Sequence, residues 1–437
     1  MTALTGQSLT NLDEFKLRLG HLSLLCDAAV NDGRSLYRLE QGLKERLTLP
    51  RQIDAEDHDR VGFYLSRKKL CEEVRDGKKV KPTNPRYPDI TVEKGEHGEF
   101  KIEPSETGDI PEIWFQDYCL SDPRVSSRTG ATTVSGKSGS KTGLSHIIDW
   151  GVELGLISKS GQPSSLTSII AHQVGSSDVL DQINNPYFLG SERIAIGYAY
   201  FNADFDVFQQ LIQFLAEQKG WISRDDARAI YVETIEQLVR TVEESSRVPT
   251  KISNQIYSLW RDIDKAAKRA RKDVAKTSTA WHRASSRFET LTDLGLLKKI
   301  GSEEDHRYEY RYLVDDRLRL AAASLSQNES ASEWLEDNTV SAVYGYEHPE
   351  AKFEKPQLLS ALVDALKPIR RPTSPLPMSS LAISVSIQMA NSDVFVPLSK
   401  IKKTVRELAL ERPDAVKLTK GVTIQSEGMV SIYPTKL

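Results

Sequence analysis

The stretches IDWGVELGLISKSG (residues 148–161) and FETLTDLGLLKKIG (residues 288–301) share one pattern, although they lie 140 residues apart. Each reads as the end of an amphipathic helix, a Leu-Gly-Leu turn, a further aliphatic residue, and then Lys and a glycine turn. Gly155 and Gly295 stand where a helix needs a left-handed C-terminal cap, which glycine adopts without steric cost. The pattern therefore predicts, twice, a helix that ends at a glycine and a following strand that packs back on it.

The second stretch extends backwards into a helix with one apolar stripe. Ala284, Phe288 and Leu291 recur at helical spacing together with Trp281, and we expect this stripe to face a core. After the helix, residues 298–314 alternate like two strands joined by an acidic turn at residues 301–305. The side of the helix opposite the stripe, expected to face away from the core, carries His282, Arg283, Ser286, Arg287 and Thr290.

These two stretches resemble the winged helix-turn-helix superfamily of bacterial and archaeal DNA-binding proteins, in which a recognition helix ends in a leucine-rich turn. The resemblance covers under a third of the chain. It implies a helix that enters the major groove and a β-hairpin wing that touches phosphate. Two alternatives stay open: a helix–strand packing corner without a ligand, and winged helices that dock other proteins.

Local charge indicates where DNA would bind. In the second unit, the expected contacts lie in three places. A basic helix that precedes the recognition helix, named here the approach helix, carries Lys268, Arg269, Arg271 and Lys272. The outward face of the recognition helix carries Arg283, Ser286 and Arg287, and the wing carries Lys298, Lys299, Arg307 and Arg311. In the first unit, they lie in a Gly/Ser-rich loop before the helix: Lys137, Ser138, Lys141 and Thr142. The alternatives are a solvated charged helix and a surface loop.

The expected fold class is mainly α, with α+β winged-helix units, in several domains. The chain divides into an N-terminal helical region (1–80), a β-hairpin or linker (81–110), a first winged-helix-like unit (111–190), a helical region with the second such unit (191–318), a helical segment with a Pro-rich linker (319–379), and a C-terminal α+β unit that is a further winged-helix candidate (380–437). Within the fourth segment, a helix break at Lys219-Gly220 and an N-cap at Ser223 are expected.

Composition limits the classes of protein further. The net charge is −3, so any DNA contact must come from local basic patches. Three widely spaced cysteines favour a reducing compartment, and no Cys/His group has zinc-ligand spacing. The first residues lack the pattern of a signal peptide, and no apolar stretch is long enough to span a bilayer. A cytoplasmic protein without a membrane partner is expected.

Two catalytic patterns are weak. Residues 131–138 loosely match a phosphate-binding loop but lack the strand and the helix that such a loop needs. In the expected hairpin near residue 90, Asp89, Glu99 and Lys101 resemble a Mg²⁺-dependent nuclease, but the expected register places Glu93 opposite Glu99 and Asp89 nearer Glu103, which is an exposed charged face. We therefore expect no catalytic residue, no metal and no cofactor.

The leading functional prediction is binding of double-stranded DNA, as a regulator or as a DNA-engaging subunit of a larger complex. The alternative is a protein-binding adaptor, whose partners are other protein subunits or further copies of the chain as a homo-oligomer. A Mg²⁺-dependent nuclease is the least favoured of the three.

Overall fold

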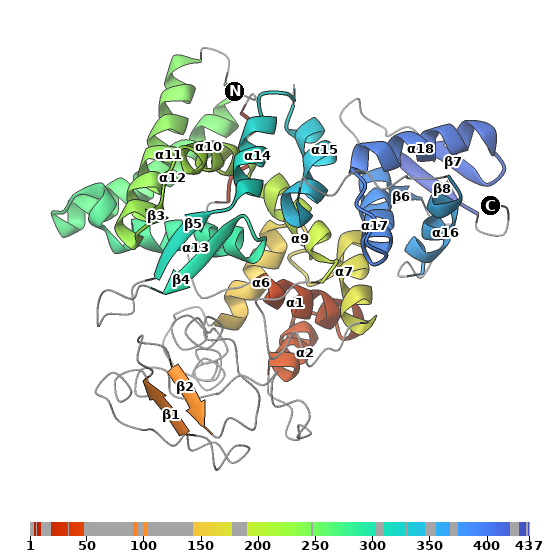
Figure 1. The fold of residues 1–437 in the computed structure, drawn as a ribbon, viewed down its shortest axis with the longest axis horizontal. Helices are drawn as coiled ribbons and strands as arrows, with labels where there is room; N and C mark the ends of the chain where they lie inside the picture. The colour runs from red at the N-terminus through yellow and green to blue at the C-terminus, as the bar shows by residue number, and fades with distance from the viewer. Residues whose placement is uncertain are drawn as a thin grey trace.

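The computed structural model of the chain (Figure 1) describes residues 4–5, 7–9, 19–33, 35–47, 91–94, 100–103, 143–176, 190–245, 248–301, 310–328, 330–345, 355–367, 375–419, 428–433 and 436. These residues form 14 α-helices and two three-stranded antiparallel sheets, besides one two-stranded hairpin. The predicted mainly α fold class with small α+β units is confirmed. Within the described ranges, none of the helices is both long enough and apolar enough to cross a membrane.

The first repeat stretch lies in a group of four short helices. These are α1 (Gly20–Asn31), α2 (Leu36–Leu47), α6 (Gly143–Glu153) and α7 (Ser165–Ser176). Gly155 follows α6 with φ +69°, as a left-handed cap requires. The strand predicted after Gly155 is reduced to one bridge, Ile157 to Pro163, before the chain enters α7.

The second repeat stretch lies in a unit of helices with one three-stranded antiparallel sheet. Its elements in chain order are α10 (Phe205–Ala216), β3 (Trp221–Ile222), α11 (Arg224–Glu244), α12 (Thr250–Ala270), a 3-10 turn at Val274–Lys276, α13 (Ser278–Asp293), β4 (Leu297–Gly301) and β5 (Tyr310–Val314). The sheet order is β3-β5-β4, so the predicted strand pair gains a third strand from before the helices. Gly295 has φ +76° after α13, and Ser223 caps α11, so both predictions are confirmed.

The C-terminal region has the same order of helices and strands, but with two helices instead of three between its first and second strands. It consists of α16 (Lys355–Ala365), β6 (Leu376–Pro377), α17 (Met378–Ala390), α18 (Leu398–Glu411), β7 (Val416–Thr419) and β8 (Met429–Ile432). The sheet order β6-β8-β7 corresponds to β3-β5-β4. The unit therefore begins earlier than expected, because β6 and the start of α17 occupy the last residues of the predicted Pro-rich linker.

The helical units share a core. One apolar cluster runs from Leu9 to Ile432, and Trp334 lies near its centre on α15 (Ala331–Tyr344). The Trp334 ring packs at 5.3–5.9 Å from the rings of Phe201, Phe205 and Phe208, which come from α9 (Arg193–Ala203) and α10. The helix α14 (Asp316–Ser324) leads from β5 into α15.

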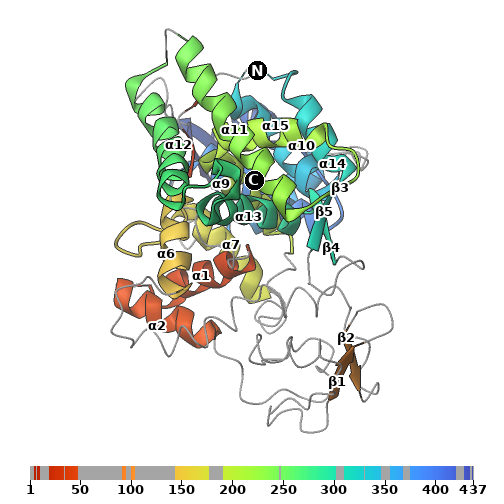
Figure 2. The same ribbon diagram turned by 90° about the vertical axis from the view of Figure 1, so that its left-hand side faces the viewer.

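A second, smaller cluster joins α10, α11, α12 and α13. The helices α11 and α12 form the left-hand end of the molecule in Figure 1, and α16, α17 and α18 form the right-hand end. In Figure 2, which looks along this axis, α12 lies in front and the C-terminal helices lie behind. The two units with a three-stranded sheet therefore stand at opposite ends of the long axis.

The predicted hairpin near residue 90 is present as β1 (Thr91–Lys94) and β2 (Phe100–Glu103). Its register differs from the expected one, because Glu93 lies opposite Lys101 rather than Glu99. Asp89 and Glu99, the two expected metal ligands of the nuclease alternative, lie outside the described residues.

Candidate nucleic-acid interface

The helix α13 was expected to be the recognition helix. Thr277 caps it, with its hydroxyl accepting from the N–H of Ala280 at 3.1 Å. Ala284, Phe288 and Leu291 are buried and face the core as predicted, whereas the side chain of Trp281 lies outside the described part.

The opposite side of α13 is also buried, and the prediction that it faces away from the core is wrong. Arg283 and Ser286 are each 4% exposed, Arg287 is fully buried and Thr290 is 2% exposed. Two parts of the chain cover this side. Helix α12 is joined to α13 by an ion pair of 3.1 Å between Asp262 and Arg283, and the N-terminal segment is joined to Arg287.

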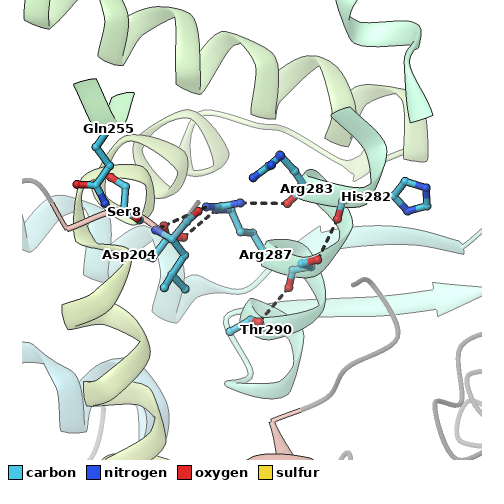
Figure 3. A network of polar contacts seen from close by, with 9 residues as sticks. Ser8, Asp204, Gln255, His282, Arg283, Arg287 and Thr290 are labelled. Carbon is cyan, nitrogen blue, oxygen red and sulfur yellow. Dashed lines mark hydrogen bonds and ion pairs between the residues drawn. The ribbon is translucent and has the colours of Figure 1, made fainter. Parts of the chain in front are cut away.

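Figure 3 shows how Arg287 is held. Its Nε donates to Asp204 Oδ2 at 2.7 Å, and its Nη2 donates to Asp204 Oδ1 at 3.0 Å and to the carbonyl oxygen of Leu9 at 2.9 Å. The guanidinium also stacks over the ring of Tyr231 at 5.2 Å. Its Nη1 donates to the carbonyl oxygen of Arg283 at 3.3 Å, so four of the five guanidinium N–H groups are engaged inside the protein. The side chain is fully buried, so it does not reach a base edge or a phosphate.

The electrostatics of the pair follow from its burial. Burial raises the pKa of the Asp204 carboxyl above its ordinary value, an effect that the Arg287 guanidinium opposes. Burial alone would lower the pKa of Arg287, but the Asp204 carboxylate, Tyr231 and Tyr200 together outweigh burial and raise that pKa. The pair is therefore a structural clamp between α10 and α13.

The expected wing is partly described. Lys298 on β4 is exposed and forms an ion pair of 3.2 Å with Asp315. Arg311 on β5 is half-buried, and the alternation of the strand turns it away from the buried Tyr312 and Val314, as predicted. The side chain of Lys299 and all of Arg307 lie outside the described residues.

The basic end of the approach helix is open to solvent. Lys268, Arg269, Arg271 and Lys272 are all exposed, so their access to a ligand agrees with the prediction. Their contact with DNA stays a prediction. The residues of the first unit's loop, Lys137, Ser138, Lys141 and Thr142, lie outside the described part of the chain.

The helix α18 holds the place of a recognition helix in the C-terminal unit. Leu398, Ile401, Val405 and Leu408 recur at helical spacing, and all are buried. Lys402 is also buried and donates to Glu336 Oε1 of α15 at 2.9 Å, so this cation anchors the helix.

The other side of α18 is open. Lys403, Arg406 and Glu407 are exposed, and Leu410 is 83% exposed. Lys403 and Arg406 are three positions apart, so they lie next to each other on the helix. Among the described side chains of α13, by contrast, none is classed as exposed. Of the two units with a three-stranded sheet, the C-terminal one therefore presents more of this helix to solvent among the described side chains.

The wing of the C-terminal unit adds further cations beside α18. Lys417 of β7 is exposed and lies over the ring of Tyr433 at 5.5 Å, and Lys436 lies 5.8 Å from the same ring. Neither α18 nor Lys417 was among the predicted site residues, because the glycine-turn motif of the other two stretches does not follow α18 in the sequence.

Comparisons with protein-family models, curated proteins and solved structures found no match for this chain. Within the described residues, no group of three or more His, Cys, Asp or Glu side chains is arranged to hold a metal ion. The candidate interface thus rests on connectivity, exposure and charge.

Proposed function

We propose that the chain binds double-stranded DNA through its C-terminal winged unit, as a regulator or as a DNA-engaging subunit of a larger complex. In this proposal α18 enters the major groove, which is wide enough for one α-helix, and the β7–β8 hairpin lies against the phosphates. The observation that carries the proposal is the exposure of Lys403 and Arg406 on α18, in contrast to the buried α13.

Charge supports this orientation. Lys403 and Arg406 make no ion pair with any described residue, so their charge is available to phosphate or to a base edge. Lys417 extends the positive surface to the wing. Glu407 on the same face disfavours phosphate and is suited to accept from the amino group of cytosine.

The test is binding to duplex DNA across a salt series. Lys403→Ala/Arg406→Ala should reduce the slope of log affinity against log salt by about two units if both contact phosphate. The matched control is Lys219→Ala/Arg240→Ala, which removes the same charge at exposed positions far along the chain from α18. If the α18 variant and the control both bind like the unmodified chain while remaining folded, the proposal is wrong.

A protein-binding adaptor is the second candidate, and a specific observation favours it. Leu410 at the end of α18 and Leu418 on β7 are 83% and 45% exposed, so this unit presents two large aliphatic side chains that a partner protein could cover. If this surface docks a further copy of the chain, Leu410→Glu should lower the molar mass measured by light scattering. An unchanged mass, together with salt-dependent DNA binding, would exclude that version of the adaptor.

A further inference from the structure

The end of α12 carries the densest group of exposed cations in the described part of the second unit. This group, named here the α12 basic end, consists of Lys265, Lys268, Arg269, Arg271, Lys272 and Lys276. Only Lys268 among them has an ion-pair partner in the described ranges, Asp264 at 2.7 Å. The remaining members are thus not neutralised by the described part of the protein.

The acidic residues beside the α12 basic end are already engaged. Asp262 is paired with Arg283, Asp264 is paired with Lys268, and Asp273 accepts from the N–H of Ala275 at 2.9 Å. Cations near a helix C-terminus favour the helix, but one or two in the last turn suffice for that effect. The number of exposed cations therefore exceeds what the helix needs.

Arg271 ends α12 as its C-terminal cap, in the left-handed region with φ +50°. The N–H of Lys272 donates to the carbonyl oxygen of Ala267 at 3.2 Å, so this backbone conformation closes the helix. A ligand is therefore indicated by the exposed charge of the α12 basic end.

The α12 basic end and α18 lie on units at opposite ends of the molecule (Figures 1 and 2). A compact chain of 437 residues is about 55–60 Å across by the usual scaling of radius with length. A 12-bp duplex is roughly 41 Å long at 3.4 Å per base pair, so it is too short to reach both surfaces.

We propose that the α12 basic end is a second phosphate-binding surface, separate from α18, and that the chain bridges two DNA segments. The inference rests on the proposed function for the first segment. The partner at the α12 basic end is the sugar-phosphate backbone of duplex DNA, because a group made up of Lys and Arg alone supplies positive charge, which is attracted to phosphate whatever the base sequence.

The experiment uses the full chain and two 12-bp duplexes, one fixed to beads and one fluorescent. The unmodified chain should retain the fluorescent duplex on the beads and bind two duplexes per chain in titration. Arg269→Gln/Arg271→Gln/Lys272→Gln should lower the retained fluorescence by at least about tenfold and bind one duplex per chain. The matched control, with the same loss of charge at other exposed positions, is Lys219→Gln/Arg240→Gln/Lys251→Gln.

Three other results would contradict either the second surface or the proposed function. If the α12 variant still bridges the two duplexes, or the unmodified chain binds a single duplex, the proposal of a second DNA surface is wrong while the α18 proposal stands. If neither this variant nor Lys403→Ala/Arg406→Ala changes binding, the proposed function itself fails. If the α12 variant binds DNA normally but loses binding to polyglutamate, the surface recognises an acidic protein and the inference is overturned.

Discussion

Arg287 and Asp204 show how a single buried pair decides what an element can do. Both side chains are fully buried and joined by two hydrogen bonds, and removing one partner would leave the other charge without compensation. We expect Asp204→Ala to lower the free energy of unfolding by about 3–5 kcal/mol, measured by urea denaturation. The control is Asp264→Ala, which breaks the exposed pair with Lys268 and should cost less than about 1 kcal/mol. Equal losses in the two variants would contradict the clamp.

The burial of Arg287 and Asp204 could not be predicted from the sequence. The stripe of Ala284, Phe288 and Leu291 was visible because helical periodicity is local. The opposite side of α13 carries Arg, Ser and Thr, which a local rule assigns to solvent. Its actual partners, Asp204 and Leu9, lie 83 and 278 positions away in the chain, and no periodicity reports contacts of that separation.

At the scale of elements, the two glycine turns allow a matched comparison. Gly155 and Gly295 are both left-handed, but a Cβ on Gly155 would meet nothing within 4 Å, whereas one on Gly295 would lie 2.5 Å from the guanidinium of Arg317. Gly155→Ala should therefore lower the free energy of unfolding by about 1–2 kcal/mol, which is the cost of a left-handed backbone for a residue other than glycine. Gly295→Ala should cost roughly 1 kcal/mol more, because Arg317 must leave the carbonyl oxygens of Gly295 and Val343. Chemical denaturation measures both, and a smaller cost at Gly295 would refute the comparison.

The sequence predicts most of the elements but not which helix is open to solvent. Both glycine caps and the N-cap at Ser223 were predicted and are present. The strand β3 was missed because two residues carry no alternation to detect. The glycine-turn motif predicted that α13 is the recognition helix. The local sequence of α13 does not indicate that α12 packs against it and covers its outward side. The exposed face of α18 depends on which sides neighbouring units cover, and that is decided only by packing.

At the scale of the whole molecule, the segment of residues 4–9 ties distant elements together. Asp206 accepts from the N–H of Thr5 at 2.8 Å, and Asp204 accepts from the N–H of Leu9 at 2.8 Å. The carbonyl of Leu9 accepts from Arg287, and the carbonyl of Ser8 accepts from Gln255 of α12 at 2.6 Å. The segment thus fastens α10, α12 and α13 at one place (Figure 3).

Deletion of residues 1–9 should therefore loosen the second unit first. It removes one partner each from the buried Asp204 and Arg287, and an unsatisfied buried group costs about 1–3 kcal/mol. At about 2–4 °C per kcal/mol for domains of 150–250 residues, Tm should fall by at least about 5 °C, and amide exchange should accelerate in α13 more than in α18. Thr5→Ala is the control, because it removes one hydroxyl contact with Asp206 and keeps the backbone of the segment. A deleted chain with the Tm and the α13 exchange rates of the full chain would show that the segment only rests on the surface.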